Sequence, residues 1–253
     1  MRNLNVLLLV LILGTGLFLT PLATAQDPAA LLQALEQVLN PDNYRMVMNM
    51  TTQRPGKADT AFTLEILHNA GVGSRMEILQ PARSAGIRFL QLGEELWLYN
   101  PRAGGSRAIR LSSQEAFQGS LFSNEDISTP DYHSAYRAQL AGTEPLLHPD
   151  FGTIEVRRLQ ALARSDSSAY SRIDFLLTLP DNLPLRIEYY ARSGLLFKTM
   201  TLGWFTELAG RIRPRIYRME SLAEPGAVTT VSIEKLEERD NPADLFDPAK
   251  LTR

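Results

Sequence analysis

Short alternating segments separated by turn residues dominate the sequence after its first forty residues, and they restrict the fold more than any other feature. In the first of them Met46, Met48 and Met50 occupy every second position, the period of a β-strand with one buried face. The predicted strands are residues 44–50, 62–66, 76–79, 87–92 and 96–99, followed by 152–163, 171–179, 183–191, 195–202, 212–222 and 228–236. This spacing predicts an antiparallel meander, and a single sheet of that many strands must curl on itself.

An amphipathic helix is predicted before the first strand, over residues 28–39. Asp27 and Pro28 form a favourable helix start, leucines at helical spacing share one face, and Asn40 with Pro41 ends the segment.

Between the two groups of strands the period changes from two to that of a helix. Ser112 with Glu115, and Ser123 with Asp126, have the spacing of capping boxes. Gly119 lies between them, so we expect two short helical turns rather than one long helix. Residues 130–149 show no clear period, and no strand is predicted there. The predicted fold class is mainly β (α+β): one curled antiparallel sheet that forms an incompletely closed β-barrel with a helical lid.

The first 25 residues have the composition of a cleaved signal peptide. Arg2 precedes an apolar run, and Ala23-Thr24-Ala25 fits a signal peptidase site before Gln26. The run is shorter and more Gly-interrupted than a spanning helix requires. We expect one domain over residues 26–253, exported without disulfides because the chain has no cysteine. Its slightly acidic charge argues against a nucleic-acid partner.

Catalytic and metal-binding motifs are not evident in the sequence. It contains no G-x-S-x-G elbow, no P-loop, no H-E-x-x-H and no G-x-G-x-x-G. His133 lies near Asp131, but a surface histidine explains this pair better than a hydrolytic triad. We therefore expect neither an enzyme nor a metal or cofactor site.

The positive signals are apolar side chains at specific positions. Methionine adapts to varied apolar shapes, so the Met46–Met50 stripe suits acyl chains, although methionine is also ordinary core filler. Trp97 and Tyr99 share one strand face and suit either the polar edge of a cavity or a packed core. The three lid candidates Phe117, Leu121 and Phe122 could form a removable lid or a permanent plug.

The most specific sequence blocks are 79–86 (LQPARSAG), 95–102 (ELWLYNPR), 109–113 (IRLSS), 117–126 (FQGSLFSNED), 183–190 (LPLRIEYY), 194–199 (GLLFKT) and Leu245-Phe246. In this order they resemble the LolA-like outer-membrane lipoprotein-sorting family. The resemblance covers essentially the whole chain after the signal, and Asn100-Pro101 departs from the Leu-Pro that relatives often have.

The resemblance implies a periplasmic carrier in a Gram-negative-type bacterium. Such a protein takes lipoprotein acyl chains, or a phospholipid-like lipid, from an inner-membrane transporter of ABC or RND type and passes them toward an outer-membrane acceptor. An alternative within the fold is a periplasmic sensor or transporter accessory that transfers no lipid. In the carrier the cavity would be lined by Met46, Met48, Phe62, Leu64, Phe89, Trp97 and Tyr99, and gated by Phe117, Leu121 and Phe122. A basic residue near the mouth could hold the lid or meet a headgroup; the candidates are Arg88, Arg102, Arg107 and Arg110.

Overall fold

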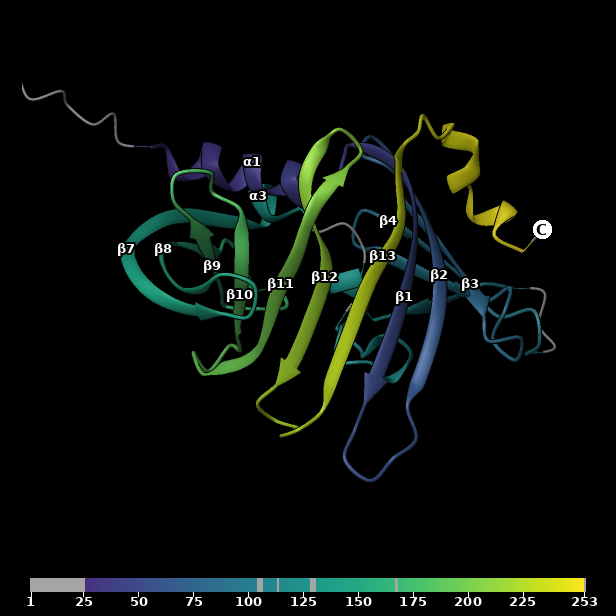
Figure 1. Cartoon of the computed structure of the whole chain (residues 1–253). Helices are drawn as coiled ribbons and strands as arrows, with labels where there is room; N and C mark the ends of the chain where they lie inside the picture. Colours follow the sequence, from purple (N-terminus) through teal and green to yellow (C-terminus); the bar gives the residue numbers. More distant parts are fainter. Residues whose placement is uncertain (1–25, 104–106, 113, 128–130, 167, 253) are drawn as a thin grey trace, which may run out of the picture.

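A computed structural model describes residues 26–103, 107–112, 114–127, 131–166 and 168–252 (Figure 1). The proposed signal peptide lies outside these residues, as does Ser113. The elements are α1 (Pro28–Leu39), β1 (Asn43–Gln53), β2 (Thr60–Asn69), β3 (Gly73–Gln80), β4 (Arg88–Leu92), β5 (Glu95–Tyr99), β6 (Ile109–Leu111), η1 (Phe117–Gly119), α2 (Asn124–Ile127), α3 (Tyr132–Ala135), β7 (Tyr136–His148), β8 (Gly152–Ala163), β9 (Arg172–Thr178), β10 (Pro184–Tyr190), β11 (Leu196–Leu208), β12 (Arg211–Ser221), β13 (Val228–Glu238), η2 (Ala243–Phe246) and η3 (Pro248–Lys250).

In the described part of the chain all 13 strands belong to one antiparallel sheet with the order β6-β5-β4-β3-β2-β1-β13-β12-β11-β10-β9-β8-β7. The first and last strands pair in its middle, for example Met46 with Leu236, so the two halves of the chain extend in opposite directions from this seam. Strands β6 and β7 end the order and do not pair with each other. The sheet curls but does not close, which confirms the predicted fold class (Figure 1).

The concave face of the sheet carries the main core. Strand β1 buries alternate residues, and its partners in β2 continue the same layer: Met48 lies opposite Leu64 and Met50 opposite Phe62. Helix α1 has the predicted bounds and packs near β7, β8 and β12 (Figure 1), burying four leucines in this core. Buried Arg213 of β12 holds the end of the helix, because its Nη1 donates to the carbonyl oxygen of Val38 at 2.8 Å.

Strand β7 was not predicted, because residues 130–149 lack a period. It lies at the edge of the sheet, and its middle residues are exposed on both faces, so no alternation of apolar residues is required. The strand also contains Pro145, which an edge strand tolerates. Strand β6, at the other edge, has only three residues and was missed for the same reason.

The predicted capping box at Ser112 differs from the structure. Ser112 Oγ accepts from Gln114 N at 3.3 Å, and the chain then forms a short 3₁₀ turn in which Gln118 has a φ of 48°. The apolar residues of this segment therefore come from irregular turns around Gly119 rather than from a regular helix.

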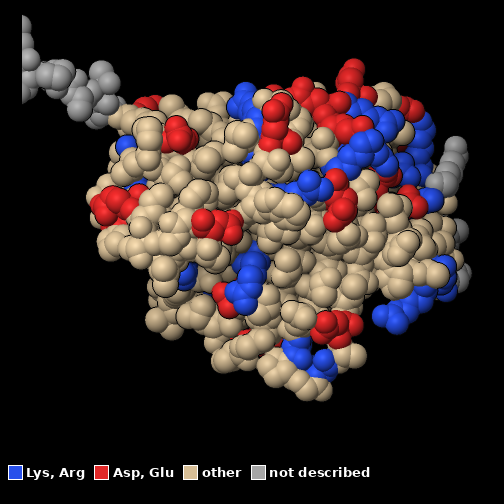
Figure 2. Space-filling view, viewed as in Figure 1, with Lys and Arg blue, Asp and Glu red and all other residues tan. Residues whose placement is uncertain are grey.

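The convex face is covered differently on its two sides. Lys, Arg, Asp and Glu gather over the upper right of Figure 2, in the region of β13, β1 and β2, where cross-strand ion pairs include Arg45 Nη2 with Glu65 Oε1 at 2.6 Å. On the other side the turn between β7 and β8 lies against β11. There His148 Nε2 is 2.8 Å from the carbonyl oxygen of Leu202, and Trp204 N donates to Asp150 Oδ2 at 2.8 Å. The hairpin of β7 and β8 thus folds over the convex face. It encloses a small second core of Leu146, Val156, Leu176 and Leu185.

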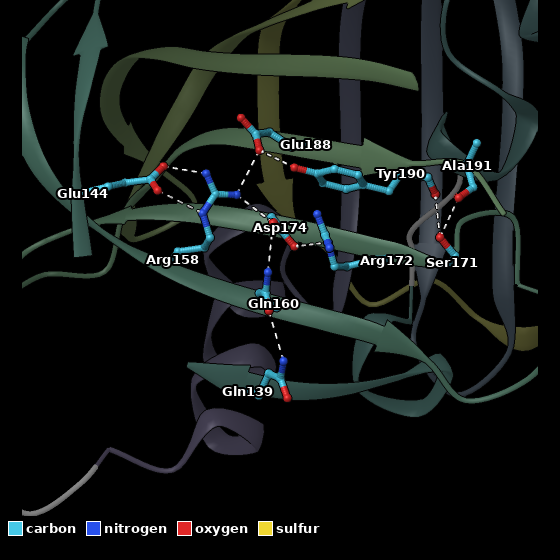
Figure 3. Close-up of polar contacts among 10 residues, drawn as sticks. All are labelled: Gln139, Glu144, Arg158, Gln160, Ser171, Arg172, Asp174, Glu188, Tyr190 and Ala191. Atoms are coloured by element: carbon cyan, nitrogen blue, oxygen red, sulfur yellow. Dashed lines mark hydrogen bonds and ion pairs between the residues drawn. The ribbon is translucent and has the colours of Figure 1, made fainter. Parts of the chain in front are cut away.

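A polar network accompanies this second core (Figure 3). Arg158 Nη1 contacts Asp174 Oδ2 at 2.6 Å and Glu188 Oε2 at 2.9 Å, while its other nitrogens reach Glu144. Asp174 is almost fully buried, and Arg172 and Arg186 add one ion pair each to Asp174 and Glu188. Burial opposes ionisation of Glu188, but hydrogen bonds from Arg158 and Tyr190 outweigh it and hold the pKa of this carboxyl below its usual value.

Candidate functional site

A cavity of about 80 Å³ lies inside the concave face, between the sheet seam and residues 122–127. Side chains of α1, β1, β2, β10, β11, β12 and β13 contribute to it. Its lining is mostly apolar and aromatic: Leu39, Asn40, Tyr44, Met46, Met48, Ile66, Phe122, Asp126, Ile127, Tyr132, Tyr189, Met200, Tyr217, Val231 and Ile233. Such a surface suits an apolar ligand with one polar end.

Residues 114–127, called the lid below, form one wall of the cavity without joining the sheet. Phe117 and Phe122 are buried in the core, and the Phe117 ring lies 5.0 Å from that of Phe89 in β4. The lid folds on itself, since Phe117 N donates to the carbonyl oxygen of Phe122 at 2.8 Å. Leu121 is half-buried against the core, and its backbone N donates to Thr229 Oγ1 of β13 at 3.0 Å. The lid is thus held by apolar packing and a small set of polar contacts.

The capping box predicted at Ser123 and Asp126 is confirmed. Ser123 N donates to Asp126 Oδ2 at 2.6 Å, and Asp126 N donates back to Ser123 Oγ at 3.2 Å. The box starts the four-residue helix α2 and fixes the direction of the Asp126 carboxylate.

That carboxylate forms a buried ion pair with Lys198 of β11. The Asp126 side chain is 5% exposed and the Lys198 side chain 3% exposed. Tyr170 donates its hydroxyl to Asp126 Oδ1 at 3.0 Å, and the Lys198 ammonium lies 5.0 Å from the Tyr170 ring and 5.2 Å from the Tyr189 ring. Burial raises the pKa of Tyr170 and of Tyr189 well above the usual range, so both phenols stay protonated. One of the polar connections between lid and sheet is therefore a charged contact in an apolar interior.

Comparisons with known proteins agree with this architecture. A family model described as "Uncharacterized protein" matches residues 72–253. The chain belongs to that family. No curated protein matches the sequence significantly.

Solved structures with the same fold come from several bacteria. A LolA superfamily protein from Nitrosomonas europaea is 23% identical, with a TM-score of 0.79 over 88% of this chain and 98% of that one. An outer membrane lipoprotein-sorting protein domain from Vibrio parahaemolyticus is 22% identical, with a TM-score of 0.73 over 89% and 98% of the two chains. A DUF1329 family protein from Desulfovibrio piger is 22% identical, with a TM-score of 0.74 over 88% and 97%. The resemblance to LolA-like proteins is thus confirmed for the fold.

Most predicted site residues meet in the interior. Met46 and Met48 line the cavity, Phe62 and Leu64 lie in the same buried layer, and Phe89 contacts the lid.

Trp97 and Tyr99 are not among the residues that line the cavity, which corrects the placement that the resemblance implies, and they lie in a packed core, the other placement that their pattern allows. Strand β5 turns Leu96 and Leu98 toward the concave core, which sends its other residues to the convex face. There Trp97 and Tyr99 pack near Phe246 and the other C-terminal residues that cover β3–β5. The alternating pattern identifies two faces but not which one is concave.

Three of the predicted arginines contact other parts of the chain. Arg88 pairs with Glu77, Arg110 pairs with Glu95 and lies over Trp97, and Arg102 donates to the carbonyl oxygens of Ala82 and Ala85, while Arg107 is exposed. Lys198 contacts the lid through Asp126, and sequence reasoning missed this residue. A signal was present, because Lys198 shares the strand face of Met200 and Leu202 and interrupts an otherwise apolar alternation.

Asp131 and His133 have structural contacts. Asp131 Oδ1 accepts from Ser134 N at 3.0 Å as the cap of α3, and His133 N donates to Glu36 Oε1 at 2.7 Å. Within the described residues, no group of three or more His, Cys, Asp or Glu side chains could hold a metal ion. No described helix is long and apolar enough to span a membrane.

Proposed function

We propose that this protein is a carrier that binds acyl chains of lipoproteins or of similar lipids in the cavity beneath the lid. The observation that carries the proposal is an apolar interior filled in part by a segment outside the sheet. Phe122 and Ile127 of the lid line the cavity directly, and Lys198, Thr229 and core packing hold the lid in place. A segment attached in this way can leave without breaking any strand pairing of the sheet.

The volume of the cavity supports a lid that moves. Ligand sites usually occupy about 300–1,000 Å³, whereas the cavity beside the lid holds about 80 Å³. Withdrawal of Phe117, Phe122 and Ile127 would empty the space that these side chains fill. We therefore regard the described conformation as the closed state, in which the lid replaces the cargo.

Competition between lid and cargo makes release possible. Burial of an acyl chain contributes about 0.8 kcal/mol per CH₂, so a long chain in an open cavity would be held almost irreversibly. Cargo binding also requires the lid's apolar side chains to leave the same cavity. The free energy that this costs offsets part of the gain and lowers the net affinity. Transfer of this kind requires binding and release and no catalytic chemistry.

The cellular setting belongs to the same proposal. Residues 1–25 act as a cleaved signal peptide, and residues 26–253 work as one domain in the periplasm. The cargo arrives from an inner-membrane transporter of ABC or RND type and passes toward the outer membrane. The LolA-like fold and the lipoprotein-sorting description of the Vibrio domain support this direction.

Native mass spectrometry of the mature protein, purified from a bacterial periplasm, tests the proposal. We expect a stoichiometric lipid or acylated peptide to remain bound. Met48→Trp should lose it, because the larger ring fills the cavity that Met48 lines. Val47→Trp is the matched control: Val47 is the neighbouring residue on β1, points to the opposite face, and should leave the cargo in place.

A clean apo mass that persists after addition of lipids and lipopeptides would contradict the carrier proposal. It would favour the sensor or transporter accessory role instead. Urea unfolding of both variants shows whether each is folded, and Met48→Phe replaces the tryptophan variant if it is not.

A further inference from the structure

The Asp126 carboxylate occupies a site that the sheet side of the molecule builds for an anion. Lys198 Nζ contacts it, and the Tyr170 hydroxyl lies 3.0 Å from Oδ1 and 3.2 Å from Oδ2. Both donors are buried, and neither belongs to the lid. A carboxylate held by a buried ammonium and a buried phenol is a strong, charge-assisted arrangement.

Opening the lid removes this carboxylate and leaves the donors behind. Asp126 moves with the lid, and so does Glu125, which interacts electrostatically with Lys198. Lys198 remains on β11 beside the rings of Tyr170 and Tyr189. An uncompensated ammonium in an apolar interior is costly, so the open state favours any ligand that returns a negative charge to this place.

We propose that the cargo is an amphiphile whose acyl chain fills the cavity while its carboxylate or phosphate oxygens take the place of Asp126 on Lys198 and Tyr170. This inference rests on the carrier function proposed above and adds the chemical class of the cargo. In the closed state the Asp126 carboxylate then occupies the position that the headgroup of the cargo takes in the open state. It keeps the lid closed against neutral apolar molecules, whereas an anionic amphiphile replaces both the lid's apolar side chains and its charge.

Titration calorimetry with matched twelve-carbon ligands tests the inference on the mature chain. The ligands are laurate, dodecyl phosphate and neutral dodecanol, which share the chain and differ in the headgroup. We expect both anions to bind at least about tenfold more tightly than dodecanol, as hydrogen bonds to charged groups allow. Inorganic phosphate and acetate, which lack the chain, should not bind measurably.

Variants separate the headgroup site from the lid. Lys198→Met should reduce the ratio of anionic to neutral affinity to near one, and Tyr170→Phe should reduce it by a few-fold. Asp126→Asn keeps the size of the side chain but weakens the closed state. It should raise the affinity for all three ligands together and leave their ratio unchanged. The double variant Asp126→Asn/Lys198→Met replaces the ion pair by two neutral side chains. If Lys198→Met alone does not fold, this variant should show the same loss of the ratio of anionic to neutral affinity.

The possible results distinguish the two proposals. Dodecanol binding as tightly as laurate, or a ratio unaffected by Lys198→Met, would overturn the headgroup site and leave the carrier function standing. Binding of inorganic phosphate alone would show that the anion comes without an acyl chain, which also overturns the inference. Failure of every ligand to bind would refute the carrier function itself.

Discussion

Replacing Arg158 with leucine is expected to lower the free energy of unfolding by about 3 kcal/mol. Arg158 contacts Asp174 at 2.6 Å and Glu188 at 2.9 Å, and the Asp174 side chain is 1% exposed (Figure 3). Loss of the guanidinium leaves two buried carboxylates with weaker compensation. Arg172 and Arg186 still contact them, which keeps the effect at the lower end of the range for a broken buried ion pair. Urea denaturation measures the change.

Arg218→Leu provides the control for this prediction. Arg218, like Arg158, forms an ion pair. Its partner is Glu220, two residues further along the same strand, and both side chains are nearly half exposed. Removal of such a surface pair should cost about 0–1 kcal/mol. Equal effects of the two substitutions would show that the buried ion pairs of Arg158 do not stabilise the protein more than a surface pair does.

The protein is expected to lose up to about 3 kcal/mol of stability between pH 6.5 and pH 4 because of His68 alone. Burial lowers the pKa of His68 to about 4, although the nearby Asp42 opposes the shift. The ring contacts Ser74 Oγ at 2.8 Å and lies beside Tyr44. In this pH window the unfolded chain binds a proton at the histidine and the folded protein does not. Stability is therefore complete above pH 6.5 and falls as the pH decreases.

The substitution His68→Asn isolates this contribution. The variant should be less stable at pH 7, because Asn fills less of the site, but its stability should change less from pH 6.5 to pH 4. The difference between the two pH profiles, from urea unfolding at each pH, removes contributions of the acidic residues. Parallel profiles would contradict a neutral, buried His68.

The sheet was largely predictable because its strands have one buried face. Strand β8 has the predicted bounds, and β9, β10, β12 and β13 differ from prediction by one or two residues. The edge strands β6 and β7 were missed, since exposure on both faces removes the signal on which strand prediction depends.

The candidate site was predictable only in part. Met46 and Met48 share the buried face that the period of β1 predicts. The period of β5 does not tell which of its faces is concave, and Trp97 and Tyr99 lie on the other face. The C-terminal segment that covers the convex face, including Phe246, has no local signal for where it packs. The pair of Asp126 and Lys198 joins residues far apart in sequence, and only the order of the strands brings them together.

A reversible lock on the lid tests the central claim most directly. The chain has no cysteine, so the double variant Leu121→Cys/Thr229→Cys can form only one disulfide, and it would join lid and sheet where Leu121 N now meets Thr229 Oγ1 at 3.0 Å. Thr51→Cys/Thr230→Cys, a cross-strand pair on the sheet face opposite that of Thr229, is the matched control. We predict that the oxidised lid variant takes up no laurate and regains uptake on reduction, while the control binds in both states. Equal uptake by the oxidised and reduced lid variant, with the disulfide verified by mass, would contradict a cavity that fills only when the lid moves.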